Sequence, residues 1–449
     1  MINNIIQQRR RKYPYHILIV MFFCCLLVMI FSISESLMSS LVSGTIIFFL
    51  LTILSTKLIL SSIKWVGFFS AIFLLKLVLG VSHYLIFVDP KYFFGNGAFP
   101  YSFWHEYHSV FNQVHDVVKS KIAHDNIFYF DKESFEVTHP EIWNLISIPL
   151  TYLGCYVLTI TPINIFFTTL FSINFVFIAK FILLLDKAKV TVVAWTSALF
   201  PMFLLADNFY RDQIGMGLLS VGLTLYLASN SRLIQKIVSI GLLMYFSYIL
   251  RTVYPAILLL SLVVYCVFKE RRNRKYLILI LPFILVLLYY SANEIIQEKE
   301  YLDRYITPSG WFFLPLKIIL GVVGPFPWTQ FMLYKVDPSF SYQLADYLLG
   351  IFQLSYLTLL IQKAKYLFKI SNINVLTLFG LGIALSGIVT KQMHIGYIAN
   401  GTVLTLPWFF SKISLSEFKK RLVLVTILLI LLNLIISILG NISISFLWR

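Results

Sequence analysis

Charged residues are scarce in this sequence of 449 residues. Only 12% are Asp, Glu, Lys or Arg, whereas 59% are hydrophobic and the mean hydropathy is +0.83. A soluble globular protein carries about a quarter charged residues, so the composition excludes an ordinary soluble fold. Apolar runs of about 20 residues recur along the chain instead, and each is long enough to cross a hydrocarbon core of about 30 Å.

Cysteine is also rare, and its four copies are scattered at Cys24, Cys25, Cys155 and Cys266. The sequence has no C-x-x-C pair and no Cys/His spacing typical of zinc, so it predicts neither a disulfide framework nor a metal site, and no cofactor is implied. A signal-peptide cleavage site is missing after the first apolar run, about 15–34, and further apolar runs follow. We therefore expect this run to be retained as a membrane helix.

Acidic residues are outnumbered by basic ones, 20 to 36, which gives a net charge of +16. The basic residues cluster between apolar runs, at 9–12, 57–64, 187–189, 232–236, 269–275, 363–369 and 412–421. Positive loops stay on the cytoplasmic side, so this pattern predicts a cytoplasmic N-terminus and orients every later segment. Membrane topology and anionic headgroups explain the charge, and no nucleic-acid partner is expected.

These features predict an all-α, polytopic integral membrane protein with about 13 transmembrane helices in one membrane domain, residues 1–449. Three helices (1–88) precede a first outer loop (89–160); central helices (162–293), a second outer loop (294–341) and four C-terminal helices (342–449) follow. Within the first loop, residues 140–159 should lie at the outer interface or re-enter from it. The predicted helices cover about 15–34, 38–56, 65–88, 162–186, 190–206, 213–229, 236–250, 252–268, 276–293, 342–362, 371–390, 396–411 and 422–445.

The first outer loop contains a carboxylate between two histidines, Glu106 between His105 and His108. Such a carboxylate is a candidate general base for a sugar hydroxyl, and His105 is a candidate substrate contact. A divalent cation is a second reading, although histidines suit magnesium poorly. An exposed loop helix with ordinary polar residues is the third.

Two arginines are predicted at outer turns, where positive charge is disfavoured. Arg211 precedes Asp212 at the start of a predicted helix, and Arg251 stands between two apolar helices. A guanidinium at the membrane edge is suited to binding phosphate, which makes both arginines candidate substrate-binding residues. Snorkelling or an Arg–Asp pair would also explain them. Asp212 is a second candidate catalytic carboxylate, or a residue that interacts with the helix dipole.

Further candidates lie in the second outer loop and at a later outer turn. Arg304 precedes a helix-breaking Gly-Pro-Phe-Pro-Trp segment that ends at Trp328, which can stack on a sugar ring or belong to an interfacial aromatic belt. Lys391 and His394 form a weaker cluster. Two lysines inside apolar runs are explained by snorkelling or by packing within the bundle: Lys76 and Lys180.

With these residues in view, the chain resembles the bacterial polytopic glycan polymerases of the O-antigen and capsule pathways (Wzy-like). The resemblance rests on the many spans, the two outer loops and three strings: Tyr210-Arg211-Asp212, Arg251-x-x-Tyr254-Pro255 and Pro325-Phe326-Pro327-Trp328. It implies an enzyme of the bacterial inner membrane that polymerises oligosaccharides linked to undecaprenyl pyrophosphate. Its expected partners are that lipid-linked glycan, membrane lipids, and a chain-length regulator and flippase of the same pathway.

Two other functions stay open. GT-C-type glycosyltransferases look similar, with a polyprenyl-phosphate sugar donor and an outer acidic base that Glu106 would match. Here three predicted helices precede the acidic loop, whereas in that family the loop usually follows the first helix and carries an aspartate. A lipid-linked oligosaccharide flippase is the third function, although flippases commonly show two related halves and this sequence shows no internal repeat.

Overall fold

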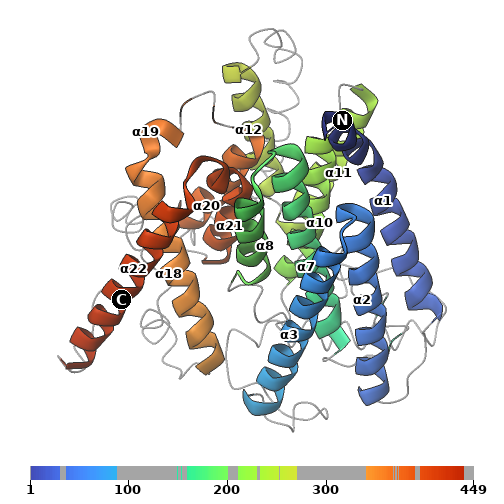
Figure 1. The fold of residues 1–449 in the computed structure, drawn as a ribbon, viewed down its shortest axis with the longest axis horizontal. Coiled ribbons are helices and arrows are strands. Elements are labelled where there is room, and N and C mark those ends of the chain that lie inside the picture. Colours follow the sequence, from blue (N-terminus) through green and yellow to red (C-terminus); the bar gives the residue numbers. More distant parts are fainter. Residues whose placement is uncertain are drawn as a thin grey trace, which may run out of the picture. The chain divides into compact units, whose positions relative to one another are not determined.

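Helices make up every element in the described part of the protein (Figure 1). The computed structural model describes residues 2–30, 37–87, 149, 153, 159–200, 211–229, 233–251, 253–269, 340–367, 369, 372, 374–389 and 395–438. The chain divides into two compact units, Met1–Arg251 and Thr252–Arg449. The prediction of an all-helical fold is confirmed for these residues, whereas the count of about 13 spans stays a prediction.

Four of the described helices are long and apolar enough to cross a membrane: Ile5–Val28, Met38–Leu60, Ile63–Ser82 and Ile160–Ile182. Their positions agree with the apolar runs from which the first spans were predicted. The elements of the first unit are α1 (Ile2–Ile30), α2 (Leu37–Leu60), α3 (Ile63–Phe87), α7 (Ile160–Phe177), the π-helix η2 (Ile178–Ile182), α8 (Lys187–Ala198), α10 (Arg211–Ala228) and α11 (Leu233–Leu250).

The helix ends differ from the predicted ones where basic clusters adjoin an apolar run. Helix α1 begins at Ile2 instead of near residue 15, so the 9–12 cluster is helical. Lysine and arginine are good helix formers, and their long side chains reach polar surroundings from a helix, so the cluster does not end the helix. The turn predicted at 57–64 shrinks to Ser61 and Ser62, with Ser61 at a φ of 49°.

Helix α7 is the centre of the first unit. It contacts α2, α3, α8 and α10 (Figure 1), and every residue of α7 except Phe167 is buried. A helix that is apolar on most sides is stable only when neighbouring helices surround it, as they do here. Aromatic rings fill the contacts: the Phe171 and Phe175 rings stack with centroids 4.1 Å apart, and Phe48 of α2 meets Phe166 at 5.6 Å.

The second unit is held by close helix packing. Helices α20 and α21 approach closely, because a Cβ added at Gly380 would lie 2.8 Å from the carbonyl oxygen of Gly401. Small residues of this kind let two backbones touch in an apolar bundle. The hydroxyls of Tyr356 and Thr405 share a hydrogen bond of 2.6 Å. The elements are α12 (Tyr254–Lys269), α18 (Phe340–Gln362), α19 (Ala364–Leu367), α20 (Val375–Val389), α21 (Ile395–Lys412) and α22 (Leu415–Ile438).

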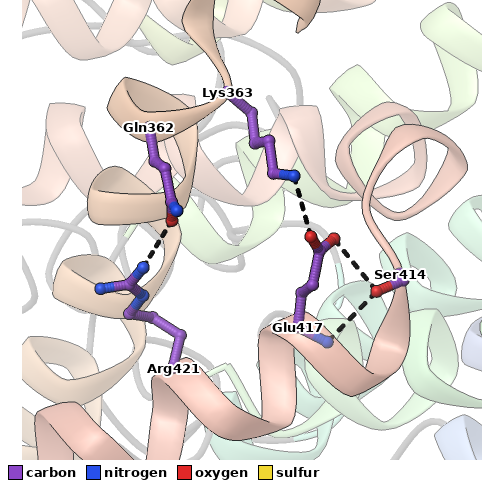
Figure 2. A network of polar contacts seen from close by, with 5 residues as sticks. All are labelled: Gln362, Lys363, Ser414, Glu417 and Arg421. Atoms are coloured by element: carbon purple, nitrogen blue, oxygen red, sulfur yellow. Dashed lines mark hydrogen bonds and ion pairs between the residues drawn. The ribbon is translucent and has the colours of Figure 1, made fainter.

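A polar network joins the end of α18 to the start of α22 (Figure 2). Lys363 pairs with Glu417 at 2.8 Å, Ser414 donates to the same carboxylate at 3.0 Å, and Arg421 donates to the side-chain oxygen of Gln362. Ser414 also accepts the backbone N–H of Glu417, which makes it the N-cap of α22. This cap explains why α22 begins at Leu415 and not near residue 422.

Replacing Gly401 by alanine is predicted to lower the free energy of unfolding by about 1–3 kcal/mol. The new methyl group would overlap the backbone of Gly380 and Ala384, neither of which can move aside easily. Unfolding by denaturant in detergent measures the change. Gly241→Ala is the matched control, because nothing lies within 4 Å of a Cβ there and alanine's helix propensity favours stability by up to about 1 kcal/mol. Equal losses in both variants would contradict the close packing.

The Lys363–Glu417 pair is predicted to stabilise the protein only at pH values at which Glu417 is ionised. The Lys363 ammonium, and after it the Ser414 hydroxyl, hold the pKa of Glu417 below its usual 4.5. Because the folded-state pKa is the lower one, the contribution is present above pH 4.5 and is lost as the pH falls through the folded-state value.

The size of this effect should stay below about 1 kcal/mol, since both side chains are exposed by more than a third. The melting temperature of Glu417→Gln should therefore fall below that of the parent at pH 7, and the difference should shrink as the pH is lowered below 4.5. Equal melting temperatures of the two proteins at pH 7 would show that the ion pair contributes nothing.

Candidate functional site

The predicted phosphate-binding arginines lie at one end of the α10–α11 pair. Helix α11 runs back along α10: a Cβ added at Gly222 would lie 3.0 Å from the Cα of Leu243, and one added at Gly215 would overlap Leu250. Gly215 is one turn after Arg211, and Leu250 immediately precedes Arg251. The backbones of Arg211 and Arg251 are therefore brought to the same end of the pair.

The start of α7 lies at this end too, because α7 and α10 advance in the same direction. A Cβ added at Gly217 would lie 2.7 Å from the carbonyl oxygen of Phe167, and further along the side-chain N–H of Asn174 donates to Ser220 at 2.9 Å. Thr159 directly precedes α7 and shares a hydrogen bond with Ser40 near the start of α2. We name this the Arg251 end of the first unit: the starts of α2, α7 and α10 and the end of α11.

The opposite end carries the basic clusters of the first unit. Arg10 donates from Nε to the carbonyl oxygen of Phe181 at 2.8 Å and from Nη2 to that of Ile182 at 3.2 Å. Arg9 donates to the hydroxyl of Ser61, in the turn between α2 and α3. The clusters at 9–12, 57–64 and 187–189 thus gather at one end, named here the Arg10 end, as the charge pattern predicts. Which side of a membrane this end faces stays a prediction.

The structure describes some of the predicted site residues and not others. Arg251 is half-buried, and its backbone N–H donates to the carbonyl oxygen of Ser247 at 3.0 Å, which closes α11. The backbones of Arg211 and Asp212 form the first turn of α10, where a carboxylate is favoured by the helix dipole. The other candidates lie outside the described residues: His105, Glu106, Arg304, Trp328, Lys391 and His394. Their roles stay predictions.

A buried polar face on α7 is the feature that the sequence analysis missed. The Nζ of Lys76 in α3 donates to the hydroxyl of Thr168 at 3.1 Å, and both side chains are fully buried. Of the two explanations for Lys76, snorkelling and packing within the bundle, the structure supports packing. The signal in the sequence was the spacing of four polar residues, which puts them on one helix face: Thr161, Asn164, Thr168 and Ser172.

A second polar chain links three helices of the first unit. The hydroxyl of Tyr13 in α1 donates to Oδ1 of Asn174 in α7 at 2.7 Å, and the amide of Asn174 donates to Ser220 in α10. Ser220 in turn donates to the carbonyl oxygen of Gly217 at 2.6 Å. All three side chains are buried, so each hydrogen bond replaces one to water that the bundle cannot supply.

The described residues include no group of three or more His, Cys, Asp or Glu side chains placed to hold a metal ion. Comparisons with protein-family models, with curated proteins and with solved structures find no match to this chain.

Tyr13→Phe is predicted to lower the free energy of unfolding by about 1–2 kcal/mol, because Oδ1 of Asn174 loses its donor. Asn174→Leu should cost at least as much, since it leaves two buried hydroxyls without this partner. The loss of unfolding free energy in the double variant should be smaller than the sum of the two single losses by about 0.5–3 kcal/mol. Tyr15→Phe is the control, since Tyr15 lies on the same helix and is 67% exposed. Additive losses would contradict the contact.

Proposed function

We propose that this protein is a glycan polymerase that joins oligosaccharide repeat units linked to undecaprenyl pyrophosphate on the outer face of the bacterial inner membrane. A hydroxyl oxygen of the acceptor glycan attacks the anomeric carbon of the donor glycan. The bond between that carbon and the lipid diphosphate oxygen breaks as the new glycosidic bond forms. The acceptor proton passes to a carboxylate, and the lipid diphosphate leaves with the bonding electron pair.

The placement of Arg211 and Arg251 is the observation that supports this proposal. Both backbones lie at the Arg251 end of the first unit, and the basic clusters that charge asymmetry assigns to the cytoplasm gather at the Arg10 end. Helices α7 and η2 together span 23 residues, about 34 Å at 1.5 Å per residue, which matches the thickness of a hydrocarbon core. With the Arg10 end in the cytoplasm, the two arginines meet substrates on the outer side.

The chemistry assigns a role to each candidate residue. Two guanidinium groups bind the diphosphate and stabilise the charge that it gains as it leaves, with help from Arg304 or Lys391. Glu106, or Asp212 in its place, accepts the acceptor proton. The remaining candidates contact the sugars: His105, Trp328 and His394. Lipid diphosphate is a good leaving group, so the scheme requires no metal.

A lipid-linked oligosaccharide flippase is the second candidate, and the buried polar face of α7 favours it. Charged and polar residues inside a membrane bundle often mark a transport pathway. Lys76 donates a hydrogen bond to Thr168, and both side chains are fully buried among the helices. Cysteine labelling separates the two functions. Cysteines at positions 211 and 251 of a carrier would react from both sides of the membrane in turn, whereas those of the polymerase would react from the outer side alone.

Arg251→Ala is predicted to slow polymerisation by about a hundredfold, as the loss of one donor to a developing negative charge does in other enzymes. Long surface glycan should disappear while single repeat units remain, and Arg211→Ala should behave alike. Gel analysis of surface glycan from a deletion strain that carries each variant measures chain length. Lys236→Ala is the matched control, because Lys236 is exposed and lies at the other end of α11.

Two outcomes would contradict the polymerase. Full-length glycan from both arginine variants would remove the proposed site, and so would a reporter fused after residue 251 that is active in the cytoplasm. Loss of one sugar from every repeat unit, with chain length unchanged, would indicate a GT-C-type transferase.

A further inference from the structure

Helix α22 carries two lysines that directly precede an exposed apolar surface along the helix. Lys419 and Lys420 are both exposed, in the second turn of the helix. The residues that follow at helical spacing are also exposed: Val423 (57%), Leu424 (46%), Ile427 (50%), Leu428 (55%) and Leu431 (49%). Because residues four apart lie on the same helix face, the lysines and the apolar side chains form one continuous strip. We name these residues the α22 strip.

The start of α22 is fixed in place by its neighbours. Lys363, directly after α18, pairs with Glu417, and Arg421 donates to Gln362 at the end of α18 (Figure 2). Glu417 is the acidic residue nearest in sequence to the two lysines, and its carboxylate is already bound by Lys363 and Ser414. The charges of Lys419 and Lys420 are therefore left for an external anion, since no ion pair is found for them among the described residues.

Further lysines lie in the elements that adjoin the start of α22. Lys412 ends α21 just before the turn into α22, and Lys365 lies in α19, directly after the Lys363 that binds Glu417. The indole N–H of Trp408 donates to the carbonyl oxygen of Asn372 at 2.7 Å, which ties α21 to the segment after α19. The carboxylate of Glu417 is already bound by Lys363 and Ser414, so it does not compete with an anion for Lys419 and Lys420.

We propose that the α22 strip binds a phospholipid with a net negative headgroup. The headgroup phosphate accepts hydrogen bonds from Lys419 and Lys420, and an acyl chain lies against Val423, Leu424, Ile427 and Leu428. An acidic protein segment would satisfy the lysines but would supply no hydrocarbon for the apolar half of the strip. A lipid matches both halves of the strip, because its charged headgroup can meet the lysines while its acyl chain lies along the apolar side chains that follow. The site is independent of the proposed polymerase reaction.

Lipid binding to the purified full-length protein tests the proposal. Detergent-solubilised protein is titrated with phosphatidylglycerol or phosphatidylcholine, and bound lipid is measured by native mass spectrometry alongside the melting temperature. Phosphatidylglycerol should bind the parent and raise its melting temperature by several degrees. The double variant Lys419→Gln/Lys420→Gln should bind it about thirtyfold more weakly, since each lysine near an anionic lipid contributes on the order of a fivefold change.

Controls keep the result specific. Neither lysine has a described partner, so without added lipid the double variant should melt at the same temperature as the parent. Lys187→Gln removes an exposed lysine that follows Asp186 and precedes the exposed polar Thr191 one turn on, and it should leave phosphatidylglycerol binding unchanged. Ile427→Ser should weaken binding even though both lysines are intact.

Three results would overturn the proposal. They are equal binding of phosphatidylcholine, unchanged phosphatidylglycerol binding by the double variant, and full displacement of the lipid by a glutamate-rich peptide. The last would identify the strip as a site for an acidic protein.

Discussion

A helix that is buried on all sides has no water to satisfy its polar groups, and this constraint acts on α7 in the first unit. This buried helix carries six polar side chains at 0% or 1% exposure: Thr161, Asn164, Thr168, Thr169, Ser172 and Asn174. Their described partners come from different helices, with Lys76 from α3, Tyr13 from α1 and Ser220 from α10. Apolar contacts alone would let α7 rotate among its neighbours. The hydrogen bonds select one rotation, and the positions of α1, α3 and α10 follow from it.

The same constraint explains how charge is distributed over the first unit. Arg10 reaches the last carbonyl groups of η2, which have no acceptor role left within the helix. Arginine at this position therefore stabilises a helix end and contributes to the charge asymmetry at once. At the Arg251 end, by contrast, hydroxyls make the contact between α2 and the start of α7. The two ends of the unit therefore differ in the side chains that make their contacts between helices.

The sequence predicted the helices better than their ends and contacts. Apolar runs near 20 residues fixed the positions of α2, α3 and α7, because span length is set by membrane thickness. The start of α1 was wrong, since a basic cluster ends an apolar run without ending a helix. The start of α22 depended on Ser414 and Glu417, a pattern of the capping-box type that hydropathy does not register.

The candidate site was predictable in part. Charge asymmetry alone indicated that Arg211 and Arg251 share a face, and the glycine contacts between α10 and α11 place their backbones at one end. The role of Lys76 could not be predicted in the same way, because a lysine that snorkels and a lysine that packs within the bundle give the same sequence pattern. Only the facing residue, Thr168 on a helix about 90 positions away, decides between the two. Glu106 and Trp328 were assigned to long loops by the sequence, and both lie outside the described residues, so their roles stay predictions.

The contact between Arg10 and the end of η2 depends on the number of residues in η2. Five residues, Ile178–Ile182, adopt π-helical geometry, in which the backbone N–H of Leu183 reaches back to the carbonyl oxygen of Ile178 at 2.8 Å. A π-turn holds about one more residue than a regular helical turn. Deleting one residue there would restore the regular helix, turn Phe181 and Ile182 by about 100° around the axis, and carry their oxygens away from Arg10.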